Sequence, residues 1–317
     1  MEVTLNVRRF DPESESSEGY FQEYSLDVPD YLTVLDALIK VREEVDGSLA
    51  LRCSCRAAIC GSCSMRVNGH AKLVCKTKIR DVATRGNHVT VEPMGNLPVV
   101  KDLVTDMKSF WDKVRAVEPW MQPNGPEPEQ EYTAPNEAML HLTGVMGCIM
   151  CGACVSDCTA LEVDKNFLGP AALAKAYRFV GDPRDDADSN RLKMYSQSGG
   201  IWDCTRCMEC VQVCPKGVAP MDRIMGLREK AIEAGYSNNN GARHTEAFVE
   251  LVKHSGRLDE LRLPLKTFGM FNFPALIGLL PVGLRALSRG KMPPIIHKAI
   301  PGAEKIRRIF EKMDGDK

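Results

Sequence analysis

The segment CIMCGACVSDC occupies residues 148–158, and CTRCMECVQVCP occupies residues 204–215. Both contain the spacing C-x2-C-x2-C-x3-C, and two such runs in one chain are typical of proteins that bind two cubane iron–sulfur clusters. In that pattern the fourth cysteine of each run binds the cluster of the other run. We therefore expect one [4Fe–4S] cluster on Cys148, Cys151, Cys154 and Cys214, and a second on Cys204, Cys207, Cys210 and Cys158.

A third group of cysteines precedes these runs. Counted from Cys55, the spacing is C-x4-C-x2-C-x11-C, which matches the plant-type pattern for a [2Fe–2S] cluster. The ligands would be Cys55, Cys60, Cys63 and Cys75, with small residues at Ala57, Ala58, Gly61 and Ser62 that let backbone N–H groups approach the sulfurs. Cys53 breaks the spacing, so we interpret it as a non-ligand. A structural zinc site is the alternative, although such sites usually show two C-x2-C pairs and this group has one.

The composition supports metal binding rather than disulfide formation. All thirteen cysteines of the 317-residue chain lie in these three groups, and the N-terminal sequence lacks the features of a secretory signal. In a reducing cytoplasm, clustered cysteines more often bind metal than form disulfides. The 41 Lys and Arg residues nearly balance the 42 Asp and Glu residues, so no overall charge favours a nucleic-acid partner.

The hydrophobic patterns predict an α+β protein of about two domains with a C-terminal extension. Residues 1–98 read as a β-grasp [2Fe–2S] ferredoxin domain, with alternating strands near residues 3–7 and 20–28, a polar loop between them at 11–19, a Thr33–Asp36 helix cap and an Asn68-Gly69 hairpin turn. Residues 99–136 predict a helix, from the apolar spacing between Leu103 and Val117, and then a proline-rich connector. Residues 137–240 predict an α-helical ferredoxin domain with the two cubane clusters and a helix that begins at Pro170.

Residues 241–317 are predicted to dock on a partner or a membrane. Eighteen uncharged residues lie between Lys266 and Arg285, but Pro274, Gly278 and Pro281 interrupt them, so a transmembrane helix is a poor fit. The basic residues Arg285, Arg289, Lys291 and Lys298 follow without an acid among them. An apolar stretch beside basic residues can lie in a membrane interface with anionic lipid, and a hydrophobic arm packed on a partner subunit is the alternative.

Nothing in the chain suggests a substrate site, and we expect no catalytic residue on it. There is no G-x-G dinucleotide fingerprint, P-loop, G-x-S-x-G or H-E-x-x-H motif, and the six histidines are isolated. The chain can therefore carry electrons but needs partners that oxidise and reduce substrates.

The sequence resembles the iron–sulfur subunits of succinate dehydrogenase and fumarate reductase over roughly residues 1–236. Besides the three cysteine groups, the resemblance is carried by the segments PVVKDLVTDM at 98–107, FLGP at 167–170, YRF at 177–179 and CPKG at 214–217, and by Asp182, Arg184 and Asp185. It implies an electron relay in respiration and the tricarboxylic acid cycle. Electrons would pass from FAD in a partner flavoprotein, through three clusters, to quinone at a membrane-anchor subunit on the cytoplasmic face of the plasma membrane.

The sequence departs from many family members at two places. The position of Cys207 is often not a cysteine, and the last cluster is then [3Fe–4S], held by the counterparts of Cys158, Cys204 and Cys210. Cys207 supplies a fourth ligand, so we expect a second [4Fe–4S] cluster. A tryptophan that contacts quinone in the family is absent from residues 159–163, and Thr205 replaces a frequent histidine.

Three functions remain open from the sequence. The leading one is the electron-transfer subunit of a succinate:quinone oxidoreductase. The second is the same subunit of a fumarate reductase, or of a complex like heterodisulfide reductase, whose electron-transfer subunits the C-terminal extension loosely resembles. Fused members of that last kind usually carry Cys-Cys-Gly repeats, and this chain has no Cys-Cys pair. The third is a cluster-bearing sensor or scaffold outside any catalytic complex.

Overall fold

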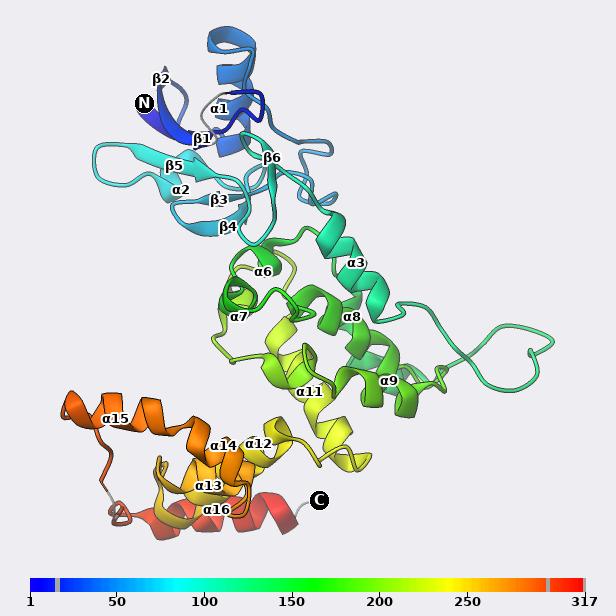
Figure 1. Cartoon of the computed structure of the whole chain (residues 1–317). Helices are drawn as coiled ribbons and strands as arrows, with labels where there is room; N and C mark the ends of the chain where they lie inside the picture. The colour runs from blue at the N-terminus through cyan, green and yellow to red at the C-terminus, as the bar shows by residue number, and fades with distance from the viewer. Residues whose placement is uncertain (15–17, 295–296, 316–317) are drawn as a thin grey trace. The chain divides into compact units, whose positions relative to one another are not determined.

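The computed structural model describes residues 1–14, 18–294 and 297–315, in two compact units of residues 1–230 and 231–317 (Figure 1). The first unit holds a β-sheet domain followed by a helical domain, and all thirteen cysteines lie in it. Of the polar loop expected at residues 11–19, residues 15–17 lie outside the described residues.

The first domain is built on a five-stranded sheet with the order β2-β1-β5-β3-β4. β1 pairs antiparallel with β2 and parallel with β5, and β3 pairs antiparallel with β5 and with β4. The strands are Glu2–Arg9 (β1), Tyr20–Asp27 (β2), Ser64–Val67 (β3), His70–Leu73 (β4) and His88–Glu92 (β5). The helices are α1 (Val34–Lys40), which continues as a π-helical turn over Val41–Val45, and the short α2 (Ile79–Val82).

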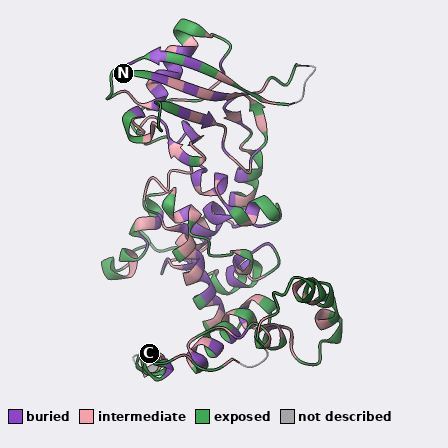
Figure 2. Cartoon of the chain, turned by 90° about the vertical axis from the view of Figure 1, so that its left-hand side faces the viewer, coloured by how far each residue is buried: buried purple, intermediate pink, exposed green. Residues whose placement is uncertain are grey.

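Local sequence explains most of this domain, as predicted. Val3, Leu5 and Val7 alternate along β1 and are buried in one core with residues of α1. Figure 2 shows buried and exposed residues alternating along the strands. Asn68 and Gly69 both have positive φ, at +50° and +84°, as a tight two-residue hairpin turn between β3 and β4 requires.

The predicted cap of α1 is also confirmed. The Thr33 hydroxyl accepts the Asp36 N–H at 3.2 Å, and the Asp36 carboxylate accepts the Thr33 N–H at 3.1 Å. This capping box begins the helix so that one face meets the sheet. The buried residues of that helix are Val34, Leu35, Ala37, Leu38 and Ile39.

The helix expected from the apolar spacing at 103–117 is only partly correct. A small hairpin of β6 (Val99–Lys101) and β7 (Val104–Thr105) comes first, and α3 spans Lys108–Ala116. The cause is Asp102, which lies in the turn with φ +46° and accepts hydrogen bonds from Arg9 Nε, the Phe10 N–H and the Ala50 N–H. A buried carboxylate needs these donors, so the chain turns at Asp102 and the helix begins later.

The second domain is helical, and most residues of α8 are buried. Gly169 has φ +87°, and Pro170 begins α8 as predicted. The elements are α4 (Asn136–Leu140), α5 (Thr143–Met146), α6 (Ala153–Ser156), α7 (Thr159–Val163), α8 (Pro170–Val180), α9 (Asp188–Tyr195), a 3-10 turn at Ile201–Asp203, α10 (Glu209–Gln212) and α11 (Pro220–Glu233).

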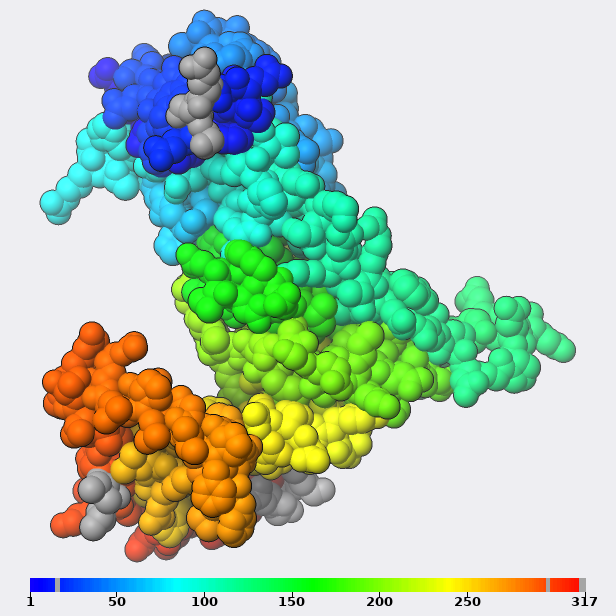
Figure 3. All heavy atoms as spheres, in the orientation of Figure 1, coloured from blue at the N-terminus to red at the C-terminus, as the bar shows by residue number. Residues whose placement is uncertain are grey.

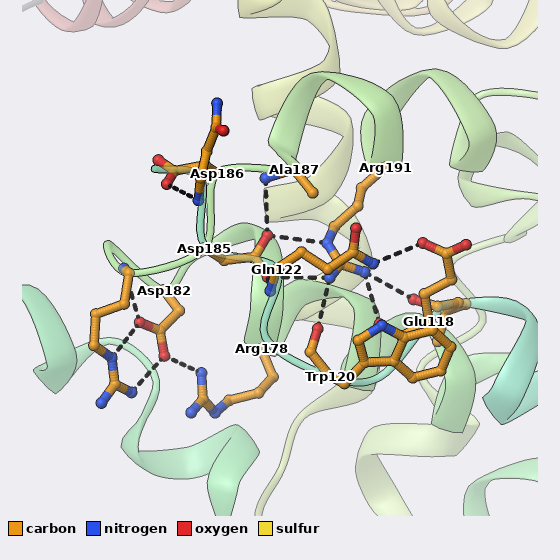
Figure 4. Close-up of polar contacts among 12 residues, drawn as sticks. Glu118, Trp120, Gln122, Arg178, Asp182, Asp185, Asp186, Ala187 and Arg191 are labelled. Carbon is orange, nitrogen blue, oxygen red and sulfur yellow. Dashed lines mark hydrogen bonds and ion pairs between the residues drawn. The ribbon is translucent and has the colours of Figure 1, made fainter. Parts of the chain in front are cut away.

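A buried arginine fastens the connector to this domain (Figure 4). The Arg191 guanidinium, on α9, donates to the carbonyls of Val117, Glu118 and Trp120 at 3.2, 2.7 and 2.7 Å. It also forms an ion pair with Asp185 at 3.0 Å, and both side chains are buried. The connector therefore starts from a fixed path despite its proline-rich composition.

A second ion cluster lies beside it. The Asp182 carboxylate is fully buried and binds the guanidinium groups of both Arg178 and Arg184 (Figure 4). Hydrogen bonds from Arg184, followed by those from Arg178, hold the pKa of Asp182 well below its usual range. Asp182 and Arg184 are among the residues that carry the family resemblance. In the structure their ion pairs stabilise the turn that follows α8.

The described residues of the second unit form the helices α12 (Asn240–Ser255), α13 (Arg262–Phe268), α14 (Phe273–Gly278), α15 (Leu280–Ser288) and α16 (Ala303–Gly315). Asn239 caps α12 by accepting the Ala242 N–H at 2.8 Å, and Gly256 ends it with φ +77°. α13 and α16 pack on α12. Pro274 and Pro281 each lie in the first turn of a short helix, so the uncharged stretch is interrupted where expected. Among the described helices, none has the length and apolarity needed to span a membrane.

Candidate iron–sulfur sites

The loop after Cys55 directs backbone N–H groups at a cysteine sulfur. The Sγ of Cys55 accepts the N–H groups of Ala57, Ile59 and Cys60, each at 3.3 Å. The loop adopts this path through left-handed conformations at Arg56 and Ala58, with φ +53° and +55°. Three amide dipoles directed at one sulfur stabilise a thiolate there, which fits a ligand of a [2Fe–2S] cluster.

The other sulfurs of this group lie in contrasting surroundings. The Ser62 hydroxyl lies 3.0 Å from Cys60 Sγ, and this hydrogen bond, with backbone N–H groups, lowers the pKa of Cys60 to about 6. Burial raises the pKa of Cys63 to about 12, against a hydrogen bond from the Cys75 N–H that lowers it. Metal ligation requires thiolates, so a positively charged iron centre next to Cys63 would offset the rise in pKa that burial causes. Cys53 is partly buried against the core of the sheet domain, as Cys75 also is.

The [2Fe–2S] loop touches the first cubane run. A Cβ added to Gly61 would lie 2.7 Å from the Cβ of Cys151, and Gly61 has φ +74°. Only glycine permits this backbone conformation and this approach without strain. The cysteine groups at 55–75 and 148–158 are therefore adjacent in space, which the sequence spacing did not reveal.

Hydrogen bonds hold the two domains together beside these cysteines. Asn96 donates its amide N–H groups to the carbonyls of Val155, Ser156 and Cys158 at 2.9, 3.2 and 3.0 Å. The Asp157 carboxylate accepts the N–H of Ala71, on β4, at 2.8 Å. The first cubane run is thus bonded directly to the sheet domain.

The two cubane runs share one backbone conformation. Met150 and Arg206, which precede the second cysteine of each run, have φ +55° and +59°. Gly152 and Met208, which follow it, have φ +80° and +71°. α6 and α10 then begin at equivalent positions and pack together. Left-handed conformations are uncommon for residues other than glycine, yet Met150, Arg206 and Met208 adopt them. The repeated loop conformation indicates that both runs hold the same kind of group.

The first four predicted cubane ligands surround one cavity. It is lined by Cys148, Cys151, Cys154 and Cys214, together with apolar residues of α8 and the segment after Cys214. Burial raises the pKa of Cys154 well above its usual value, and its neighbours Cys151 and Cys148 add to the rise. The Val218 N–H donates to Cys214 Sγ at 3.4 Å. Three cysteines of the first run and the last cysteine of the second run therefore meet, which fits the thiolate set of a cubane cluster.

The remaining four predicted ligands also interact. Burial raises the pKa of Cys158, and Cys207 and Cys204 are its cysteine neighbours. Burial raises the pKa of Cys210 to about 12, with contributions from Cys204, Cys158 and Cys207. Each thiolate of an iron–sulfur cluster binds its own iron, so the four need not converge on one point. Indeed, within the described ranges no three His, Cys, Asp or Glu side chains are placed to hold a single metal ion.

Three residues beside this second set were not recognised from the sequence as contacts of a ligand. Burial alone would raise the pKa of Cys207, but hydrogen bonds from Thr159 and Thr205, together with the Glu209 N–H, lower it. The buried Arg228 donates to the carbonyl of Cys204 at 2.8 Å. Thr205 replaces the histidine that is frequent in the family, and Thr159 begins the stretch 159–163 from which the family's tryptophan is absent. The contacts of Thr159 and Arg228 join distant parts of the chain, so no spacing in the sequence could have revealed them.

Comparisons with known proteins identify both domains of the first unit. Residues 4–112 match the family described as a 2Fe-2S iron-sulfur cluster binding domain, and residues 144–218 match the 4Fe-4S dicluster domain. The chain is 34% identical over 235 residues to the mitochondrial succinate dehydrogenase (ubiquinone) iron-sulfur subunit 1 of Oryza sativa subsp. japonica, which covers 73% of this chain and 83% of that protein. The chain belongs to the family of iron–sulfur subunits of succinate dehydrogenase and fumarate reductase.

Two further relatives of this family cover different parts of the chain. The 8-methylmenaquinol:fumarate reductase iron-sulfur subunit of Wolinella succinogenes is 31% identical over 297 residues, covering 91% of this chain and 90% of that protein. This coverage extends beyond the first unit into residues 231–317. The solved Mycobacterium smegmatis Sdh1 complex in the apo form contains a chain with a TM-score of 0.68 and 28% identity, covering 75% of this chain and 98% of that one.

The expected fold class is confirmed. A [2Fe–2S] ferredoxin domain with a β-sheet precedes a mostly helical dicluster domain. The chain is thus an electron-transfer subunit of an oxidoreductase family, and the match at residues 4–112 favours a [2Fe–2S] cluster over zinc in the first cysteine group.

Proposed function

We propose that this chain is the electron-transfer subunit of a succinate:quinone oxidoreductase. It would take electrons from FAD in a partner flavoprotein and deliver them to quinone at a membrane-anchor subunit, on the cytoplasmic face of the plasma membrane. The observation that carries this proposal is the continuity of the three cysteine groups. Gly61 of the first group touches Cys151 of the second, and Cys154 of the second lies near Cys210 of the third.

The proposed ligands are the twelve cysteines in three groups. The [2Fe–2S] cluster would be held by Cys55, Cys60, Cys63 and Cys75, the first [4Fe–4S] cluster by Cys148, Cys151, Cys154 and Cys214, and the second by Cys158, Cys204, Cys207 and Cys210. When bound, such clusters supply one-electron transfer. The chain contributes the thiolates, the N–H groups directed at them, and the buried surroundings that set each potential.

We infer a [4Fe–4S] rather than a [3Fe–4S] cluster at the third group. Cys207 occupies the same position as Cys151 in a loop of the same conformation, because Arg206 and Met208 repeat the left-handed geometry of Met150 and Gly152. A thiolate is therefore available for the fourth iron.

Fumarate reduction is the second candidate. The Wolinella succinogenes relative, named as a fumarate reductase subunit, covers 91% of the chain and extends into the second unit, whereas the Oryza sativa succinate dehydrogenase subunit covers 73%. The same three clusters would then carry electrons from quinol to the flavoprotein.

The experiment is anaerobic purification of the complex from membranes by a tag on this chain. We expect an FAD-containing chain and a membrane subunit to co-purify, and this chain to hold about ten irons, two plus four plus four. Comparing succinate-dependent quinone reduction with quinol-dependent fumarate reduction separates the two candidates. A colourless or zinc-loaded chain would contradict the cluster assignment. A cluster-loaded chain without a flavoprotein would favour the sensor hypothesis.

A further inference from the structure

Two consecutive helices of the second unit carry an apolar stripe that the described part of the chain leaves exposed. Phe273 and Ile277 on α14, followed by Leu280, Leu284 and Leu287 on α15, recur at intervals of four, three, four and three residues. These side chains are between 58% and 65% exposed. Spacing of this kind normally places residues on the packed side of a helix, so an exposed stripe indicates a surface that meets something outside the chain.

The turn before α14 adds two more exposed apolar side chains. Met270 is 66% exposed and Phe271 is 85% exposed. Gly269, with φ +86°, ends α13 and directs the chain into this turn. α14 and α15 appear in orange in the space-filling view (Figure 3). The apolar surface thus spans α14, α15 and the turn before them, and we call residues 270–288 the apolar edge.

The charges around the apolar edge have one sign. Residues 261–303 contain no Asp or Glu but six Lys or Arg residues. Arg262 and Lys266, which precede the apolar edge, pair with Asp259 and Glu250, respectively. Within the described ranges, Arg285, Arg289 and Lys291 have no acidic partner, and they lie on or just after α15.

We propose that the apolar edge binds the surface of a membrane that contains anionic phospholipid. The aromatic and aliphatic side chains would enter the boundary between headgroups and acyl chains, while the three unpaired cations bind headgroup phosphates. The prolines at the starts of α14 and α15 divide the segment into two short helices, which suits a position in the plane of the membrane rather than across it.

The charge pattern favours lipid over a protein partner. A protein surface that covered the apolar edge would have to supply several acids to three cations gathered at one end, whereas an anionic bilayer presents phosphates everywhere beside an apolar interior. This inference goes beyond the proposed function, because it assigns a membrane contact to this chain itself in addition to any anchor subunit.

The test is flotation of the full-length, cluster-loaded chain with vesicles. We expect binding to vesicles of phosphatidylcholine with about 30% phosphatidylglycerol to exceed binding to pure phosphatidylcholine, and to weaken with salt. The triple variant Phe273→Ser, Leu280→Ser, Leu284→Ser should reduce binding to both vesicles roughly tenfold or more. The variant Arg285→Gln, Arg289→Gln, Lys291→Gln should bind both vesicle types equally.

The matched control replaces exposed apolar residues of the first unit. Tyr31 and Val45 are 66% and 59% exposed, so Tyr31→Ser with Val45→Ser removes exposed apolar side chains elsewhere, and this variant should float like the unmodified chain. Cluster absorption and circular dichroism of each variant establish that it is folded. These readouts need no succinate, so their failure is distinct from failure of the proposed function.

Two results would overturn the inference. The first is a full-length chain that does not float, or that floats without regard to phosphatidylglycerol. The second is a triple serine variant that floats normally but loses the co-purifying membrane subunit, which would assign the apolar edge to a protein partner.

Discussion

Ser62 shows how one side chain can set the behaviour of a whole cluster. Its hydroxyl is 3.0 Å from Cys60 Sγ, and hydrogen bonds to cluster sulfurs favour the reduced, more negatively charged state. We expect Ser62→Ala to lower the potential of the [2Fe–2S] cluster, on the order of tens of millivolts. Redox titration followed by electron paramagnetic resonance measures this shift.

The controls for that titration are internal. Ser62→Thr keeps the hydroxyl and should restore most of the potential, and the two cubane signals should stay unchanged in both variants. An unchanged [2Fe–2S] potential in Ser62→Ala would show that the hydroxyl does not bond to the ligand sulfur in the loaded protein.

Cys207 is the residue that determines the third cluster under the proposed assignment. Replacing it with serine removes a thiolate from that group alone, so Cys207→Ser should alter the third signal and leave the [2Fe–2S] and first [4Fe–4S] signals intact. Low-temperature electron paramagnetic resonance distinguishes the three. Cys53→Ser is the matched control, because Cys53 lies outside the ligand spacing and its replacement should leave all three signals unchanged. A [3Fe–4S] signal in the unmodified protein, with no iron lost in handling, would contradict the assignment.

At the scale of elements, the ion cluster after α8 predicts a dependence of stability on pH. The pKa of Asp182 is lowered in the folded chain by Arg184 and Arg178. The Asp182 carboxylate therefore contributes its full share of the free energy of unfolding above about pH 3.9, the pKa of Asp in the unfolded chain. This contribution is lost as the pH falls from there through the lower pKa of the folded chain. Asp182→Asn should lose about 3–5 kcal/mol of stability at pH 7, because two arginines would be left near an uncharged partner.

Urea unfolding followed by circular dichroism at pH 7 and at pH 3 measures both effects. The loss of stability between these pH values should be smaller in Asp182→Asn than in the unmodified chain. Asp186→Asn is the control, since the carboxylate of Asp186 accepts an exposed hydrogen bond from the Asn124 N–H and, among the described residues, forms no ion pair with an arginine (Figure 4). Equal acid sensitivity in all three chains would show that Asp182 is not responsible.

Sequence predicted the elements whose causes are local. The alternation in β1, the Thr33 cap of α1 and the proline at the start of α8 act within a few residues, and all three predictions were confirmed. The helix predicted from Leu103 was wrong at its start, because Asp102 is bonded to Arg9, far away in the sequence. Cysteine spacing indicated which residues gather in each group, but Thr159 and Arg228 reach those groups only through the tertiary fold.

At the scale of the whole molecule, we expect cluster binding to belong to the first unit and membrane binding to the second. The chain of the Mycobacterium smegmatis Sdh1 complex is covered over 98% of its length by 75% of this chain, so about a quarter of this chain has no counterpart in that solved structure. A chain that ends after residue 236, beyond α11, should therefore keep all three cluster signals. It should also lose vesicle binding.

Absorption and electron paramagnetic resonance spectra of the truncated chain, with flotation in parallel, test both outcomes. A chain truncated at 236 that loses its clusters would show that the second unit supports the first. One that still floats would place the lipid contact in the first unit.

The meeting of Cys214 with Cys148, Cys151 and Cys154 also has a consequence for biosynthesis. Under the proposed assignment, the ribosome completes the [2Fe–2S] ligand set at Cys75, when most of the polypeptide is still unmade. Neither cubane set is complete before residues 210 and 214 have left the exit tunnel. The maturation machinery can thus load the first centre during translation, whereas the other two must wait and then be filled at nearly the same moment.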